Sequence, residues 1–475
     1  MLNLPMDILF IFSLLLSSLS IFSKKRERMI GGLTLLGFSL SFLSLLHYYL
    51  NYEIPLIIEI TSLGNLSSFF RIDNFSCFLS FLSLFICILI TFFSLHFPGR
   101  KKASFFILLL LCEFGLLGVL FSFDFFTLFV FWEIMAITSY FLITFGKGEN
   151  ELVALKYVII SAVGSATFLF SLALLFGRVG SLNFHNVLEF VESEDSMFLK
   201  FLFVLMIVCF LIKVGIVPFH SWVPDTYQKA YTPTTVLFSS ILSKLGLFVI
   251  LRILFIFYPI IQFSQLALTL LAIPTMFLGN ILALFEQDLK RLLAFSSIAH
   301  MGYILFAFSI FTQDSLTAAL FHMFNHSIVK SLMFFVAGIC LYSTGKSKLK
   351  ELRGIGKRNE ILAGAIIIGS FSLIGMPPFA IFVSELFIIL SAIEVNELFL
   401  ASLVIFNILL SMVYYIRILR ELALKRGTGK KKIKLPLTME LPILILSIAC
   451  LLVGIYPWPV LSFLEKVVEF LFKLF

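Results

Sequence analysis

The chain is built from apolar runs of about twenty residues separated by short polar loops, and this pattern sets its fold class. Roughly 20 helical residues cross the hydrocarbon core of a bilayer, so each run has the length of one membrane-spanning helix. Of the 475 residues, 60% are hydrophobic and only 13% are charged, which is more apolar surface than a soluble core could cover. The sequence therefore predicts an all-α polytopic membrane protein, a single membrane domain over residues 1–475 with about 14 transmembrane helices. The predicted spans are 3–22, 29–50, 74–97, 103–122, 125–145, 152–177, 198–217, 231–257, 263–285, 291–311, 315–342, 360–391, 397–421 and 438–457.

The loops alternate in charge, which predicts their orientation. Basic residues gather at 24–28, 100–102, 290–291, 346–358 and 425–434, and acidic residues at 53–59, 189–195 and 394–397. Basic loops stay in the cytoplasm, so both termini are predicted on the non-cytoplasmic side of the cell (inner or cytoplasmic) membrane. The net charge of +8 is then a topology signal, and we expect lipid contacts but no nucleic-acid partner. The amphipathic tail from 459 to 475 is expected to lie at the membrane interface.

Two predicted spans contain prolines that must interrupt them. Pro218 follows Lys213 by five residues, and Pro377 and Pro378 lie within the span 360–391. Proline removes a backbone donor and clashes with the preceding turn, so both helices are expected to break. The breaks are five spans apart, which predicts two inverted five-helix repeats at about 103–257 and 263–421.

Ionisable residues recur inside the predicted spans. The candidates for proton transfer are Glu133, Lys213, His220, Lys244, His300, His322, His326, Lys330 and Glu385. The residues at 322, 326 and 330 are spaced by four and therefore lie on one helix face. Charged groups at this depth cost free energy and are by default functional. Burial disfavours the charged form of a group and a nearby opposite charge favours it, so a row of such groups can pass protons.

Each of these residues also has a structural interpretation. A single intramembrane histidine such as His300 most simply makes a hydrogen bond between helices, and Glu133 with Lys213 could form only a structural ion pair. Glu113 and Arg252 lie nearer the ends of their spans and are expected to face headgroups. The full set, spread over six helices, is harder to explain structurally and favours a water-linked proton path.

The sequence gives no indication of chemistry carried by the chain itself. His322 and His326 have a zinc-like spacing but lack the glutamate of His-Glu-x-x-His, and the six cysteines form no Cys-x-x-Cys pair. No cofactor or metal is therefore expected, and the chain is predicted to have no catalytic centre of its own. The longest loops have about twenty residues, too few for a soluble domain, so any energy source must lie on another polypeptide.

At these residues the sequence resembles the antiporter-like subunit family. This family includes the proton-pumping membrane subunits of respiratory complex I, the large subunits of multisubunit cation/proton antiporters and the membrane subunits of energy-converting hydrogenases. The motifs that carry the resemblance are Asp124…Phe-Trp-Glu133, Lys213-x4-Pro-Phe-His220-x-Trp-x-Pro-Asp225-x4-Ala230-x-Thr-Pro233, Ser239-x3-Ser-Lys244-x-Gly, Asp288-x-Lys-Arg-x-Leu-Ala-x-Ser-Ser297-Ile-x-His300-Met-Gly and His322-x2-Asn-His326-x3-Lys330.

The resemblance implies roles for these residues. Glu133 and Lys213 would form the coupled ion pair of a first half-channel, and Lys244 would lead to the centre, near the three histidines and Lys330. Glu385 would end the row, as in the middle-type subunit of complex I or its hydrogenase equivalent.

The resemblance and the charge row predict an ion-translocating membrane subunit of a larger complex. It would move protons, or alternatively sodium, as part of an NADH- or ferredoxin-linked dehydrogenase or a hydrogenase complex, with other membrane subunits and soluble redox subunits as partners. Two alternatives stay open: a subunit of a gradient-driven sodium/proton antiporter, and a scaffold that keeps the fold without conducting.

Overall fold

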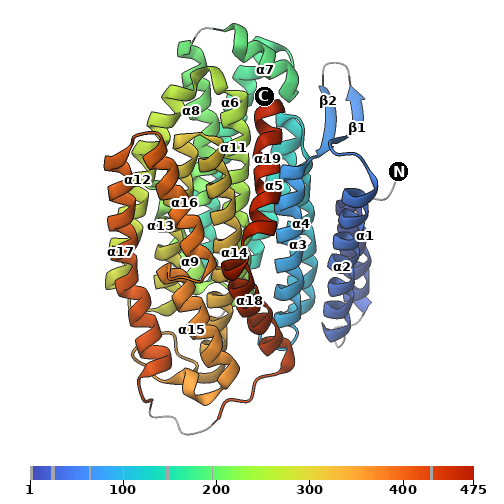
Figure 1. Ribbon diagram of the computed structural model, residues 1–475. Coiled ribbons are helices and arrows are strands. Elements are labelled where there is room, and N and C mark those ends of the chain that lie inside the picture. The colour runs from blue at the N-terminus through green and yellow to red at the C-terminus, as the bar shows by residue number, and fades with distance from the viewer. Residues whose placement is uncertain are drawn as a thin grey trace.

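The computed structural model describes residues 4–22, 27–63, 66–99, 101–145, 150–194, 196–427 and 432–474. Over these residues the chain forms one bundle of roughly parallel helices with a two-stranded hairpin at one end (Figure 1). The charged loop residues Lys24, Lys25, Arg26, Arg100, Asp195, Lys430 and Lys431 lie outside the described residues.

The elements follow in chain order. They are α1 (Pro5–Phe22), α2 (Glu27–Asn51), β1 (Leu56–Leu63), β2 (Leu66–Ile72), α3 (Asn74–Ser94), α4 (Lys102–Phe121), α5 (Phe125–Ile143), α6 (Asn150–Val179), α7 (Phe184–Ser193), α8 (Ser196–Val214), the 3₁₀ turn η1 (Phe219–Ser221), α9 (Trp222–Lys229), α10 (Thr232–Leu237), the π-helix η2 (Phe238–Leu242), α11 (Ser243–Ile256), η3 (Tyr258–Ile260), α12 (Ile261–Phe285), α13 (Leu289–Ile310), α14 (Gln313–Thr344), η4 (Ile355–Arg358), α15 (Glu360–Ile374), α16 (Ala380–Glu394), α17 (Leu398–Leu419), η5 (Arg420–Leu424), α18 (Leu437–Ile455) and α19 (Trp458–Leu474).

The helices agree with the predicted class of polytopic membrane protein. Within the described residues, 12 helices are long and apolar enough to cross a membrane. The two other predicted spans correspond to the shorter helix α1 and to the pair α15 and α16, into which the span 360–391 is divided. The total of fourteen crossings therefore stays a prediction.

The centre of the bundle is formed by α11, α13 and α14. Every residue of α11 is buried, and so is nearly every residue of α13. A helix that is apolar on all sides packs in a core rather than at a surface, and these two helices follow that rule. The pair α1 and α2 lies at one edge of the bundle, and α12 and α17 lie at the opposite edge (Figure 1). Polar side chains on the three central helices are thus shielded from the lipid.

Two helices are interrupted where the prolines predict it. The α8 helix ends at Val214 and α15 ends at Ile374, and each is followed by Gly-x-x-Pro-Phe. Gly215 has φ +84° and Gly375 has φ +72°, a left-handed conformation that glycine adopts without strain. The amide of Ile216 donates to Leu211 O at 3.0 Å, and that of Met376 donates to Phe371 O at 3.3 Å. The two breaks are locally equivalent, whereas the inverted repeats at 103–257 and 263–421 stay a prediction.

The last helix differs from the sequence expectation. The tail was expected at the membrane interface, but α19 lies lengthwise in the bundle, packed against α14 and α3 (Figure 1). Its apolar residues Leu461, Leu464, Val467 and Leu471 are buried by protein. An amphipathic pattern shows which face of a helix is covered but does not show whether protein or a membrane surface covers it.

A hairpin occupies the predicted acidic loop around residues 53–59. Strands β1 and β2 pair antiparallel, with a register shift between Glu59 and Thr61. The backbone of Phe123 donates to Phe69 O at 3.0 Å, which joins the hairpin to the turn between α4 and α5. The hairpin lies beside the end of the bundle that is opposite to the loop between α14 and α15 (Figure 1).

A buried ion cluster fixes α3 and α11 to the hairpin, and it corrects the expectation for Arg252. The Asp73 carboxylate lies 3.4 Å from Nη2 of Arg252 and 3.6 Å from Nε of Arg71. All three side chains are at most 5% exposed, so Arg252 does not face headgroups. Asp73 also caps α3 by accepting from the Ser76 amide at 2.7 Å. One carboxylate thus holds two guanidinium groups and a helix end.

We expect Asp73→Ala to destabilise the fold strongly. Removing one partner of a buried ion cluster costs about 3–5 kcal/mol, and losing an N-cap costs about 1 kcal/mol more. The measurement is thermal unfolding in detergent. Asp314→Ala is the matched control because Asp314 is an exposed aspartate in the first turn of α14. Equal unfolding temperatures for the two variants would show that the cluster contributes nothing.

Candidate functional site

Lys213 lies in an aromatic cage beside the first helix break. Its side chain is 5% exposed, and Nζ donates to the Tyr140 hydroxyl at 3.3 Å. The same atom lies 5.0 Å from the Tyr157 ring, 5.1 Å from the Tyr140 ring and 5.9 Å from the Trp132 ring. Aromatic faces attract a cation through their quadrupoles, most strongly where water is excluded. The cage can therefore hold a positive charge without a carboxylate.

Glu133 is near this cage but does not pair with Lys213. Its carboxylate accepts from Ser165 Oγ of α6 at 2.5 Å, and its side chain is half-buried between α5 and α6. The predicted ion pair is absent, since no contact within 4.0 Å joins these two described residues. Glu133 and Tyr140 both belong to α5, seven residues apart. Lys213 thus contacts the neutral hydroxyl of Tyr140 on α5, and the Glu133 carboxylate lies about two helical turns away on the same helix.

Lys244 lies at the centre of the bundle beside a short π-helix. The segment Phe238–Leu242 widens the helix before α11, and Lys244 Nζ donates to the Ser239 carbonyl, five residues back. The ammonium also donates to Ser243 Oγ at 3.3 Å and to His326 Nδ1 at 2.7 Å. A π-helix releases backbone carbonyls from the usual pattern and is frequent at functional sites. It supplies the polar partner that a fully buried ammonium needs.

Three histidines continue from Lys244 across α14 and α13. The rings of His326 and His300 are 4.8 Å apart between centroids. His300 Nδ1 lies 3.0 Å from His322 Nε2, and His322 Nδ1 lies 2.9 Å from Ser384 Oγ of α16. The Ser384 hydroxyl donates to Ile381 O, so it accepts from His322 Nδ1–H. This places the proton of neutral His300 on Nδ1, toward His322.

Lys330 and Glu385 complete the central cluster. Lys330 Nζ donates to Ser296 Oγ and to Leu293 O of α13, the latter at 3.2 Å. Glu385 directly follows Ser384 and is 5% exposed. A Cβ at Gly375 would collide with its carboxylate, so Glu385 touches the second helix break. Lys213 lies at one break and Glu385 at the other.

His220 is the predicted site residue that the structure leaves apart. It belongs to the turn after the first break and is half-buried. Its Nδ1 atom is buried without a hydrogen-bond partner among the described residues. The structure joins Lys244, His326, His300 and His322 by hydrogen bonds and ring contacts but does not place His220 among them.

Within the described part of the chain, no carboxylate lies within 4.0 Å of Lys213, Lys244 or Lys330. Each ammonium meets only hydroxyls, carbonyls, an imidazole or aromatic rings. A buried charge without a counter-ion is expensive, so its free energy responds strongly to small movements of its neighbours. This is the electrostatic setting in which a group gives up or takes a proton easily.

Aromatic rings separate the Lys213 cage from the central cluster. The Tyr157 ring, 5.0 Å from Lys213 Nζ, packs against Trp222 at 4.4 Å and against Phe238 at 5.4 Å. Phe238 directly precedes Ser239, whose carbonyl accepts from Lys244. The two clusters therefore meet through rings rather than through a direct hydrogen bond between their charged groups.

A network of tyrosines and asparagines beside His300 was not predicted. Tyr415 OH lies 3.1 Å from His300 Nε2. Near it, Tyr414 OH donates to Asn280 Oδ1 at 2.7 Å, and Tyr303 OH donates to Asn407 Oδ1 at 2.8 Å. These side chains come from α12, α13 and α17 and are fully or almost fully buried. The sequence signal that could have indicated this network is the presence of Asn280 and Asn407 in the middle of apolar helices.

Glu113 also differs from expectation, because it is buried rather than facing headgroups. It is 1% exposed and accepts from Ser83 Oγ at 2.5 Å and from Cys87 Sγ at 3.4 Å, both on α3. Its two donors are neutral. Glu113 is therefore a further buried carboxyl group, next to α5 but outside the predicted row.

Known proteins are similar to this chain in sequence and in fold. A family model described as NADH:quinone oxidoreductase/Mrp antiporter, TM, matches residues 122–411. NADH-quinone oxidoreductase subunit N of Dehalococcoides mccartyi is 30% identical over 488 residues, which cover 98% of each chain. A chain of the membrane-bound sulfane sulfur reductase, an archaeal respiratory membrane complex, superposes with a TM-score of 0.89 at 27% identity, covering 98% of this chain and 96% of that one. A chain of the Mrp complex from Dietzia sp. DQ12-45-1b shares the fold, with a TM-score of 0.88 at 21% identity and coverage of 98% and 97%. The sequence resemblance is thereby confirmed, and the chain belongs to the NADH:quinone oxidoreductase/Mrp antiporter transmembrane family.

Proposed function

We propose that this chain is an ion-translocating membrane subunit of a larger respiratory or hydrogenase-type complex, and that it moves protons along its buried lysines, histidines and glutamates. The observation that carries the proposal is the series from Lys244 through His326, His300 and His322 to Ser384, which crosses four helices at the centre of the bundle. A purely structural core has no need of so many ionisable groups in contact.

The histidine series suits stepwise proton transfer. A neutral imidazole accepts a proton at one nitrogen and releases another from the opposite nitrogen. A proton from Lys244 would enter at His326 Nδ1, and a proton reaching His300 would leave through His322 toward Ser384 and Glu385. The step from His326 to His300 has ring contact but no hydrogen bond, so it requires a ring rotation or a water molecule.

The first half of the path is a switch at Lys213. When the ammonium pairs with Glu133, the carboxylate stabilises its charge. When it lies in the aromatic cage, as in this structure, only neutral groups and ring faces support the charge. Moving between the two positions changes how strongly Lys213 holds its proton.

The energy source is proposed to lie on partner subunits. The described chain is a helical bundle without a soluble domain, and its relative from Dehalococcoides mccartyi is named as a subunit of an NADH-quinone oxidoreductase. Neighbouring membrane subunits would link this chain to soluble redox subunits, with lipid covering the remaining faces.

A gradient-driven sodium/proton antiporter is the second candidate function. The shared fold with a chain of the Mrp complex favours it. The content of iron–sulfur clusters or nickel in the purified complex separates the two candidates. A non-conducting scaffold is disfavoured because Lys213, Lys244, Lys330 and Glu385 are all buried without a neutralising ion pair among the described residues.

Lys213 gives the sharpest test of the proton path. Lys213→Ala is expected to reduce proton uptake into vesicles containing the purified complex at least about tenfold, without loss of assembly. Lys213→Arg should fail equally, because a guanidinium keeps its proton at physiological pH. Glu133→Gln should also impair uptake, since the charged position of Lys213 is lost.

Lys200→Ala is the matched control for this series. Lys200 belongs to the same helix, α8, and its Nζ lies 5.8 Å from the Phe263 ring, away from the cage. Its removal should leave the rate unchanged. Wild-type pumping by Lys213→Arg would make Lys213 a structural charge, and the path would then have to use other residues.

The aromatic cage is tested at Tyr157. Replacing it by leucine removes a ring face worth about 0.5–2 kcal/mol to a nearby cation, so transport should fall roughly 2- to 30-fold. Tyr157→Phe keeps the ring and should stay close to wild type. Assembly is checked on a native gel. Equal rates for the leucine and phenylalanine variants would show that the ring face does not support the charge.

The proposed orientation places the basic loops in the cytoplasm of a cell whose inner membrane holds the chain. A cysteine replacing the exposed Lys350 should react with an impermeant thiol reagent only after the cells are opened. A cysteine replacing the exposed Glu397, in the loop between α16 and α17, should react in intact cells. All six native cysteines are buried, so the background should be low. The reverse labelling pattern would invert the topology.

A further inference from the structure

A small pocket lies at the basic end of the bundle, where α2 and α4 begin and α3 ends. Its volume is about 250 Å³, and it is lined by Glu27, Arg28, Leu95, His96, Lys102 and Phe106. His96 Nδ1 is also 2.8 Å from Thr438 Oγ1, in the first turn of α18. Segments far apart in the sequence thus build one polar pocket.

The pocket has more positive charge than its own residues neutralise. Arg28 and Lys102 both line it, and neither forms an ion pair within 4.0 Å among the described residues. The one acidic lining residue is Glu27. Lys102 Nζ donates to Leu95 O at 3.1 Å, which occupies one of its three donor positions. Two like charges facing one cavity repel each other unless an anion lies between them.

The start of α4 adds to this positive potential. Lys101, at its N-cap, makes no side-chain capping hydrogen bond. The first amides of a helix carry partial positive charge and favour an anion. Arg28, Lys102 and these amides therefore point to one anionic ligand in the pocket.

The apolar part of the pocket identifies the kind of anion. Leu95 and Phe106 also line it, and Met29 and Leu36 on α2 are exposed. A free phosphate ion has no use for apolar contacts, whereas a phospholipid brings acyl chains attached to its phosphate. Basic pockets between helices on the cytoplasmic side are typical sites for anionic lipid headgroups.

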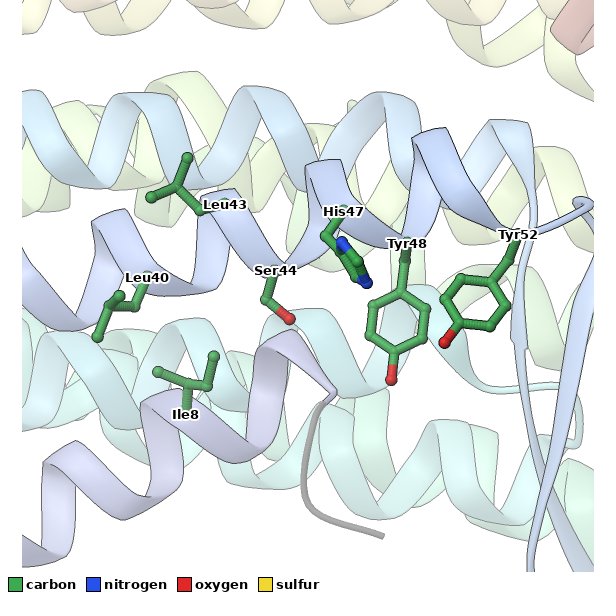
Figure 2. A pocket seen from close by; sticks show the side chains of 7 residues that line it. All are labelled: Ile8, Leu40, Leu43, Ser44, His47, Tyr48 and Tyr52. Atoms are coloured by element: carbon green, nitrogen blue, oxygen red, sulfur yellow. The ribbon is translucent and has the colours of Figure 1, made fainter.

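The position of the pocket along α2 agrees with that of a lipid headgroup layer. At the other end of α2, a groove of about 410 Å³ contains His47, Tyr48 and Tyr52, whose side chains lie beyond the apolar Leu40 and Leu43 (Figure 2). Tyrosines of this kind mark a membrane–water interface. Arg28 and Tyr48 are 20 residues apart in α2, or about 30 Å of helix, which equals the thickness of the hydrocarbon core. Arg28 therefore lies at the opposite headgroup layer.

We propose that this pocket binds the phosphate group of one anionic phospholipid, with its acyl chains along the exposed face of α2. The site is separate from the ion path and does not depend on the proposed function. Its ligand would anchor α1 and α2 to the rest of the bundle, because the pocket joins residues of α2 to residues of α3 and α4.

The test is lipid retention by the full-length chain, purified with the subunits that stay bound to it. The protein is reconstituted in vesicles of phosphatidylcholine with phosphatidylglycerol or cardiolipin, extracted gently, and analysed by native mass spectrometry. Wild type should retain one anionic phospholipid more than the double variant Arg28→Gln/Lys102→Gln. The variant should bind that lipid roughly 30-fold more weakly, since it lacks both cations that would contact the phosphate group.

The matched control is Lys346→Gln/Lys350→Gln, which removes the same charge from exposed positions of a loop at the same end. It should retain the lipid as wild type does. Equal retention by both double variants would overturn the proposal, as would equal retention of phosphatidylcholine at the site. Displacement of the lipid by inorganic phosphate at low millimolar concentration would assign the pocket to a free anion and would also overturn it.

Discussion

The structure depends on placing ammonium groups in a membrane interior without carboxylates beside them. Lys213, Lys244 and Lys330 each need polar partners, yet an unbroken α-helix uses all of its backbone groups internally. The chain meets this need by departing from α-helical geometry close to two of the charges. The π-helix before α11 presents the Ser239 carbonyl to Lys244, and the break after Val214 follows Lys213 directly. The second break touches Glu385. Irregular backbone therefore occurs beside Lys213, Lys244 and Glu385, whereas Lys330 lies in the unbroken helix α14.

Hydropathy and proline positions were sufficient to predict a bundle of apolar helices and the two breaks, and the spacing by four placed His322, His326 and Lys330 on one helix face. These signals are local, since they depend on residues a few positions apart. The contact between His300 and Tyr415 joins residues 115 positions apart, and the sequence around neither residue predicts it. The π-helix was equally hidden, because its residues resemble those of an ordinary apolar helix. Glu113 was misplaced because distance from a span end does not show which neighbour a side chain faces.

The opening between Glu133 and Lys213 shows a further limit of sequence reasoning. A motif identifies two partners but not the position in which the structure holds them. Here Lys213 lies with Tyr140, Tyr157 and Trp132, two of which belong to the same helix as Glu133. The sequence alone did not identify Trp132 and Tyr140 of α5 as partners of Lys213. Their role becomes visible only when the end of α8 packs against them.

If protons follow the proposed path, its interruption is itself a functional requirement. A continuous series of hydrogen bonds across the bundle would let protons flow down their gradient without doing work. In this structure the rings of Tyr157, Trp222 and Phe238 stand between the Lys213 cage and Lys244, and His326 meets His300 by ring contact alone. Each gap needs a movement of side chains or the entry of water before a proton can cross. Coupling then follows if a partner subunit biases those movements, because an ion passes only when the gaps close in order. The cage beside Lys213 is well placed for this control, since the lysine side chain would lie there either against the Glu133 carboxylate or against neutral rings.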